Sequence, residues 1–149
     1  MLAHQIVPSL LRDVLHYEHP ALIERLRQEL EISMVEADQL FADTKKFLVL
    51  CGTADERLAP SPRIDECWHR FLLFTRDYAE FCQRFFGRFI HHQPKTSDET
   101  AGSDGSPIRM TLERAREAFG DALSANWAYR GATCLSDCTR CSGSTNCHN

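Results

Sequence analysis

Several features that would point directly to a function do not occur in this chain of 149 residues. No apolar run is long enough to cross a bilayer, and the start, MLAHQIVPSLL, has no basic region ahead of an apolar one. We therefore expect no membrane anchor and no signal peptide, and the cytoplasm is the default location. The nucleophile elbow, the glycine-rich phosphate loop and the HExxH zinc helix are also missing, so no motif assigns an enzyme class.

Basic charge is also scarce. The chain has 17 Lys and Arg against 21 Asp and Glu, which gives a net charge of -4. Proteins that bind nucleic acid through their overall field need clustered basic residues, so we do not expect a nucleic-acid partner. Hydrophobic residues make up 43% of the chain and charged residues 26%, which is typical of one soluble globular domain at this length.

Strand patterns and internal repeats are missing, whereas apolar residues at helical spacing recur, which predicts an all-α fold. We expect a compact bundle of about four to five helices in residues 1–94. A flexible linker over 95–106, a C-terminal helix over 107–130 packed on the domain and a cysteine-rich tail over 131–149 should follow. In the C-terminal helical region, Ser106 or Thr111 can cap a helix that ends at Gly120, and residues 122–129 add a turn. Within the bundle, Ser33 and Glu36 form a capping box that starts a helix ending near Gly52, after shorter helices over 8–17 and from Pro20.

Residues 60–94 form the stretch around which the fold is organised, because they hold six of the nine Phe residues. At 100° per residue, ten residues fall on one broad apolar face: Trp68, Phe71, Leu72, Thr75, Tyr78, Ala79, Cys82, Phe85, Phe86 and Phe89. This pattern predicts a single long central helix from about residue 65 to 89, with Ser61 or Asp65 accepting from its first free N–H groups. The cysteines at 51, 67 and 82 lie on core faces, where we expect them to act as small apolar residues.

Asp65 and His69 are four residues apart and so share one face of this helix, next to Trp68. His91 and His92 follow where the chain leaves the helix. A straight helix would separate Asp65 from His91 by roughly 39 Å, so we do not expect one site to use both ends. Two interpretations remain open: Asp65 caps the helix and hydrogen-bonds His69, or Asp65, Trp68 and His69, with His91 or His92, form a functional centre.

The same stretch carries a family resemblance. Its run I-D-E-C-W-H resembles the conserved block of the glycine-rich domain-containing protein family, as do the residues that follow it in the matching order: Tyr78, Cys82, Phe86 and Gly87. The resemblance covers the central third of the chain. It implies a helical fold and a special role for Asp65 and His69.

The end of the chain, CLSDCTRCSGSTNCHN, is the second chemical feature. It contains Cys134, Cys138, Cys141 and Cys147, with His148 next to the last cysteine. Such donors can surround a tetrahedral zinc ion, and the Cys-x2-Cys pair is a frequent half of a zinc site. An iron–sulfur cluster is the less favoured alternative, and a reduced tail without metal stays open. The first three cysteines also have the spacing of a radical S-adenosylmethionine loop, but that loop lies early in a larger α/β barrel and is rejected here.

Three functions are compatible with these features. We favour a small helical binding or interaction module whose cysteine tail, with a bound metal or with free thiols, contacts a protein partner. The first alternative is a metal-dependent enzyme or maturation factor centred on Asp65 and His69. In the second alternative the cysteine-rich tail is itself modified while the helical body provides recognition. No catalytic residue can be assigned from the sequence.

Overall fold

The computed structural model describes residues 6–93 and 105–129. These residues form six α-helices and one short 3-10 helix, and no strand occurs among them. The helices are α1 (Pro8–Leu15), α2 (Pro20–Leu30), α3 (Met34–Thr53), α4 (Pro62–Leu73), α5 (Thr75–Phe86) and α7 (Ser106–Phe119), followed by η1 (Ala125–Trp127). The predicted all-α bundle is confirmed, with slightly more helices than expected.

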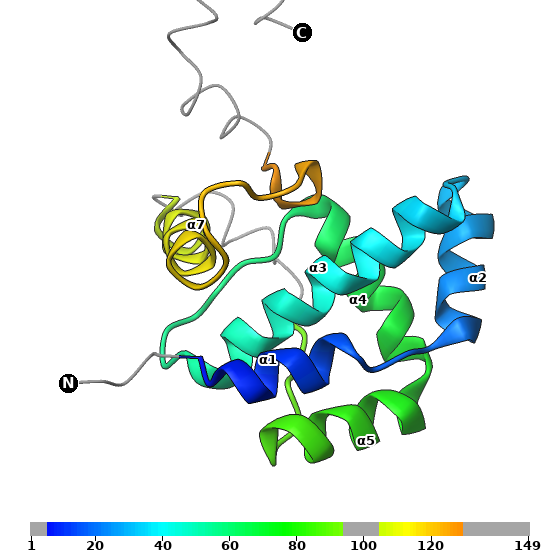
Figure 1. Ribbon diagram of the computed structural model, residues 1–149, viewed down its shortest axis with the longest axis horizontal. Helices are drawn as coiled ribbons and strands as arrows, with labels where there is room; N and C mark the ends of the chain where they lie inside the picture. The colour runs from blue at the N-terminus through cyan, green and yellow to red at the C-terminus, as the bar shows by residue number, and fades with distance from the viewer. Residues whose placement is uncertain (1–5, 94–104, 130–149) are drawn as a thin grey trace, which may run out of the picture.

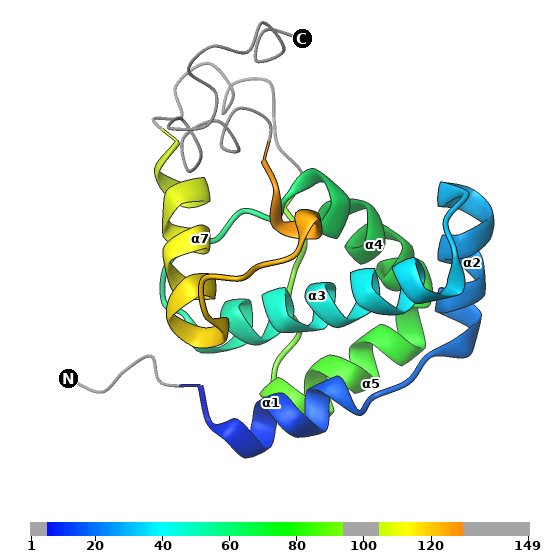
Figure 2. The same cartoon turned by 45° about the horizontal axis from the view of Figure 1, so that its top comes forward.

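Helix α3 lies at the centre and contacts each of the other described helices (Figure 2). Its capping box is formed as predicted: the Glu36 N–H donates to Ser33 Oγ over 3.2 Å, and the Ser33 N–H donates to the Glu36 carboxylate over 2.7 Å. The consecutive residues from Phe47 to Leu50 are all buried. A helix with buried residues in such a continuous run must be covered on more than one side, which explains why it forms the core.

The prediction of one long helix over residues 65–89 is wrong, because the helix is interrupted at Phe74, which separates α4 from α5. Phe74 has φ −83° and ψ 66°, outside the helical region, and its carbonyl accepts from Tyr78 N–H to start α5. The Phe74 ring packs 4.6 Å from the His19 ring, with the Arg25 guanidinium 6.0 Å from its centroid. These contacts from the start and middle of α2 favour a turn that the local pattern did not show.

The break also changes which residues are buried. Trp68, Phe71, Tyr78 and Cys82 lie in the core as predicted. Phe81, which the continuous-helix pattern left off the apolar face, is buried as well. Three residues expected on that face are instead exposed: Thr75, Ala79 and Phe89. The cause is that α5 turns relative to α4, so one helical wheel cannot describe both.

Lys45 on α3 is a buried cation that closes the end of α1. Only 4% of its surface is exposed, and Nζ donates to the carbonyl oxygens of Leu15 at 2.9 Å and Tyr17 at 2.7 Å. Nζ also lies 4.6 Å from the centroid of the Phe41 ring. The ammonium thus satisfies carbonyls left free at the end of α1, while burial lowers the pKa of Lys45 to about 8.

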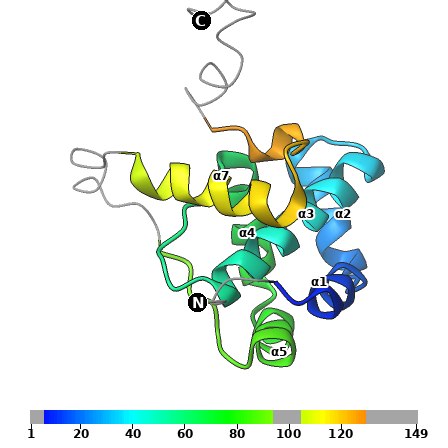
Figure 3. The ribbon, with the colours of Figure 1, turned by 60° about the vertical axis from the view of Figure 1, so that its left-hand side comes forward.

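Helix α7 packs against α3, and the chain after it returns across the body to η1 (Figure 3). Its C-terminal stop at Gly120 is as predicted, but Gly105 occupies the N-cap position without a side-chain hydrogen bond, so Thr111 does not cap it. The side chain of Ser106 lies outside what the structure describes. The return segment is fixed by Asp43, which is 1% exposed. Asp43 accepts from three groups of this segment: Ser124 Oγ at 2.7 Å, Asn126 Nδ2 at 2.9 Å and Trp127 Nε1 at 3.1 Å.

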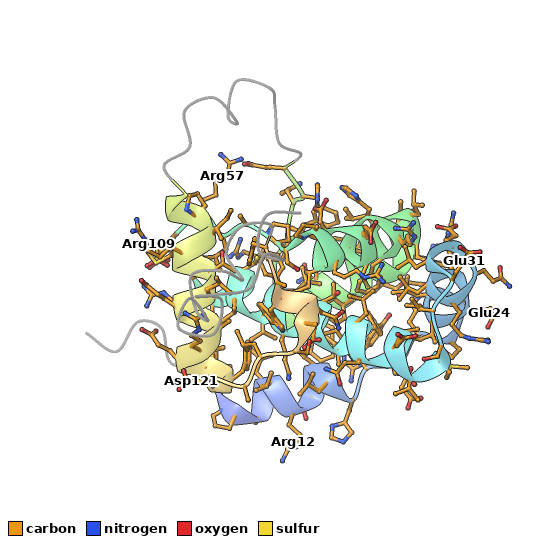
Figure 4. The ribbon with its side chains drawn as sticks, turned by 90° about the horizontal axis from the view of Figure 1, so that it is seen from above. Arg12, Glu24, Glu31, Arg57, Arg109 and Asp121 are labelled. Atoms are coloured by element: carbon orange, nitrogen blue, oxygen red, sulfur yellow. The ribbon has the colours of Figure 1, made fainter. Side chains whose placement is uncertain are left out.

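The outer surface is charged. Side chains such as Arg12, Glu24 and Asp121 project away from the helices (Figure 4). Among the described residues, none of the helices combines the length and apolar character needed to span a membrane. Most of the predicted linker and the whole cysteine tail lie outside the described residues, as does His148.

Candidate metal centre

Asp65, His69 and His92 form a cluster of three potential metal ligands. One donor atom from each lies within 4.8 Å of the other two. Asp65 Oδ1 is 2.6 Å from His92 Nε2, and Asp65 Oδ2 is 3.7 Å from His69 Nδ1. The imidazole centroids of His69 and His92 are 4.2 Å apart. The carboxylate therefore lies between two histidines that belong to different segments.

The break at Phe74 makes this cluster possible. Helices α4 and α5 form a V, and residues 87–93 run back from the far end of α5 towards the first turn of α4 (Figures 1 and 2). Gly87 starts the return with φ 67°, a left-handed conformation that suits glycine. The expectation that no site could use both ends of this stretch is thus wrong, because the chain doubles back instead of continuing as one helix.

The local structure of α4 determines where Asp65 and His69 lie. Ser61 accepts from Ile64 N–H at 3.2 Å and is the N-cap, so Asp65 is free of the capping role considered for it. Four-residue spacing then puts Asp65 and His69 on adjacent turns of the same face. Asp65 also lies in the first turn of α4, where a carboxylate is favoured by the helix dipole.

The return segment is held by buried side chains beneath the cluster. Trp68 Nε1–H donates to Tyr78 Oη over 3.0 Å, and Tyr78 Oη–H donates to the Ile90 carbonyl over 2.5 Å. The Trp68 ring also contacts the His92 ring edge to face, with centroids 4.5 Å apart. Burial raises the pKa of Tyr78 above its usual range, so its hydroxyl keeps the proton that it donates.

One side of the cluster faces solvent. The side chain of His92 is 9% exposed, whereas Asp65 is 34% and His69 is 51% exposed. His92 is therefore fixed in the interior, and the other two residues form the accessible edge. A ligand or ion would approach from the side of His69.

The remaining candidate residues lie elsewhere. His91 is exposed and packs on the Phe89 ring at 4.7 Å, so it is outside the cluster although it adjoins His92. Trp68 is a support beneath the cluster. The cysteines at 134, 138, 141 and 147, with His148, lie outside the described residues, so the tail site stays a prediction. Tyr78 was expected only as a core residue, and the hydroxyl bond to the Ile90 carbonyl has no sequence signal.

A second histidine–carboxylate pair provides a comparison. His19 Nε2 is 2.7 Å from Asp77 Oδ2, while His19 Nδ1 accepts from Leu22 N–H at 3.0 Å. Both ring nitrogens are therefore occupied within the fold, and no other ligand group joins the pair in a cluster of the described residues. His19 is the N-cap of α2.

A family model described as UCP032817-like matches residues 11–118, which is more than half of the chain. The chain belongs to the UCP032817-like family. The resemblance to glycine-rich domain-containing proteins is therefore wrong: a short aromatic helical block matched, but the match over the longer segment is to a different family. Searches of curated proteins and of solved structures each returned no match.

The UCP032817-like match contains Asp65, His69 and His92 and ends before the cysteine tail begins. The family description names no reaction, ligand or partner. The chemistry of the Asp65, His69 and His92 cluster is therefore the main indication of function.

Proposed function

We propose that this protein binds one divalent transition-metal ion, with zinc as the first candidate, through Asp65, His69 and His92. The observation that supports this most strongly is the convergence of three donor groups from α4 and from the segment after α5 within 4.8 Å. Two imidazoles and one carboxylate are a frequent ligand set for zinc and for non-haem iron.

The donor spacing suits a small ion. A tetrahedral zinc ion about 2.0 to 2.2 Å from each ligand separates neighbouring donor atoms by roughly 3.4 Å. Asp65 Oδ1 lies closer than this to His92 Nε2, at 2.6 Å, while the other carboxylate oxygen, Oδ2, lies 3.7 Å from His69 Nδ1. Rotations of the half-buried Asp65 carboxylate and of the exposed His69 ring would bring one oxygen and the two ring nitrogens to this spacing while His92 stays in place.

The coordination number determines what the ion can do. Structural zinc sites usually have four protein ligands, whereas three ligands leave a position for water or an outside donor. The exposed edge formed by Asp65 and His69 gives access to that position. We favour a metal-dependent binding module, in which a side chain of a protein partner completes the coordination.

A second candidate function follows from the same ligand count. Three protein ligands plus water is the arrangement of hydrolytic zinc enzymes, in which the ion lowers the pKa of the bound water. A metal-dependent enzyme is therefore the alternative.

For either function we propose that the protein is located in the cytoplasm. The buried cysteines at 67 and 82 are free thiols, which suits a reducing compartment.

The test is a cobalt(II) titration of the full-length chain with the four tail cysteines changed to serine, so that tail thiols cannot bind the ion. The parent should bind one cobalt ion and show visible absorption bands. Asp65→Asn, His69→Ala and His92→Ala should each weaken binding by more than the 10- to 100-fold typical of changes around a ligand. His91→Ala is the matched control and should bind as the parent does, because His91 lies outside the cluster.

Two results would contradict the proposal. The first is a parent protein that binds no cobalt up to millimolar concentration, and the second is three ligand variants that bind cobalt as tightly as His91→Ala does. Either result would leave Asp65 as a carboxylate that only hydrogen-bonds its neighbouring histidine. Circular dichroism of each variant distinguishes the loss of a ligand from the loss of the fold.

A further inference from the structure

The cluster has a buried foundation formed by Trp68 and Tyr78. Trp68 lies between Asp65 and His69 along α4, is 4% exposed and contacts the His92 ring. Tyr78 is fully buried on α5. The two side chains thus link α4, α5 and the return segment at the point where the three ligand residues meet.

The hydroxyl of Tyr78 has a specific polar connection in addition to its packing. It accepts from Trp68 Nε1–H and donates to the carbonyl of Ile90, two residues before His92. Since both bonds are buried, no water replaces either partner if the hydroxyl is removed. The hydroxyl therefore fixes the backbone of the return segment relative to α4.

From this connection we infer that Tyr78 is a positioning residue for the metal site, holding His92 in reach of Asp65 through the Ile90 carbonyl. That the site binds a metal ion rests on the proposed function, whereas the part that Tyr78 plays in placing His92 does not depend on it. Trp68 acts with Tyr78, because its N–H orients the hydroxyl and its ring packs against the imidazole. Groups that orient ligands in this way commonly change metal affinity by about 10- to 100-fold when altered.

A purely structural role would give a different pattern. A buried phenylalanine would fill almost the same volume as Tyr78, so the packing around α5 would persist. Tyr129 provides a matched comparison, since it is 3% exposed and donates its own hydroxyl to the Ala59 carbonyl at 2.5 Å. Losing either hydroxyl removes one hydrogen bond to a backbone carbonyl, but only Tyr78 is connected to the segment of His92.

The experiment compares Tyr78→Phe with Tyr129→Phe in the full-length chain with tail cysteines changed to serine. Two readouts are used: cobalt(II) affinity, and the NMR signal of the His92 Nε2 proton in the metal-free protein, which its bond to Asp65 protects from exchange. Tyr78→Phe should weaken cobalt binding by about 10-fold or more and should broaden or remove this proton signal. Tyr129→Phe should leave both unchanged.

The outcomes separate the two proposals. If the parent binds no cobalt but Tyr78→Phe still removes the His92 proton signal, the proposed function fails and the positioning role stands. If the parent binds cobalt and Tyr78→Phe changes neither readout relative to Tyr129→Phe, the positioning role is wrong and the metal site stands. Should Tyr78→Phe fail to fold, Trp68→Phe, which keeps a ring but lacks the N–H donor, takes its place under the same criteria.

Discussion

Replacement of Asp43 by alanine should release the segment that connects α7 to the end of the described chain. Asp43 is 1% exposed and accepts from Ser124, Asn126 and Trp127. The alanine variant leaves the indole N–H of Trp127 buried without an acceptor, because Trp127 is 2% exposed. The half-buried Ser124 and Asn126 can regain water.

The expected loss of stability in Asp43→Ala depends on how deeply each of the three donors is buried. A buried donor without a partner costs about 1 to 3 kcal/mol, and the two half-buried donors cost less. Removing a desolvated carboxylate offsets part of the loss. We therefore expect Asp43→Ala to lower the free energy of unfolding by about 3 kcal/mol, a large share of the 5 to 15 kcal/mol typical of a domain.

Urea unfolding followed by circular dichroism measures this change. Asp38→Ala is the control, since Asp38 is an exposed residue of the same helix and should change stability by no more than about 0.5 kcal/mol. Hydrogen exchange should be faster at residues 124–129 in Asp43→Ala, with the amides of α2 unchanged. Equal stability of the two variants would refute the anchoring role of Asp43.

Three further predictions concern titration and thiols. Burial lowers the pKa of Lys45 from 10.5 to about 8, so between these values the unfolded chain binds a proton that the folded chain has released, and stability from Lys45 should rise with pH. The free energies of unfolding of the wild type and of Lys45→Met are measured across this pH range, and their difference isolates the contribution of Lys45 because all other groups titrate in both proteins. A difference that does not change with pH would contradict the prediction. Burial raises the pKa of Cys51 and Cys67 to about 12, so both thiols should resist iodoacetamide at pH 8 until the protein unfolds. Peptide mapping checks this, and rapid labelling of Cys51 or Cys67 in the native protein would contradict it. In the wild-type chain, a metal ion in the tail should be lost in Cys138→Ser with Cys141→Ser, and unchanged metal content would remove the predicted tail site.

The elements that sequence reasoning predicted correctly have strong local signals. The capping box of Ser33 and Glu36 fixes the start of α3, and Gly120 lies just past the end of α7. Apolar residues at helical spacing predicted the all-α fold, and members of that pattern such as Leu26 in α2 and Leu40 in α3 are buried. These signals depend on residues within one or two turns, so they can be recognised without knowledge of the tertiary structure.

The sequence predicted only part of the candidate site, because one of its three residues is brought in by tertiary packing and not by a local signal. Asp65 and His69 are neighbours on a helix, so their spacing alone paired them. His92 joins them only because the chain turns at Phe74, and neither glycine nor proline marks that turn. The turn depends on contacts with His19 and Arg25 of α2, more than 45 residues earlier in the chain. Such contacts are set by tertiary packing and have no local signature.

The same limit applies to the support beneath the site. Trp68 and Tyr78 were assigned to the core from periodicity, and both are buried. Their hydrogen bonds to each other and to the Ile90 carbonyl need the V of α4 and α5 to exist first. A sequence pattern shows that a side chain is buried, whereas its polar partner follows from the assembled fold.

The most direct test of the metal site is anomalous diffraction from crystals of the full-length protein grown with zinc or cobalt. We predict a peak about 2.0 to 2.2 Å from one donor atom each of Asp65, His69 and His92, with the 2.6 Å hydrogen bond between Asp65 and His92 opened. The lack of a peak at these three residues, or an intact hydrogen bond between Asp65 and His92 at saturating metal, would contradict the account.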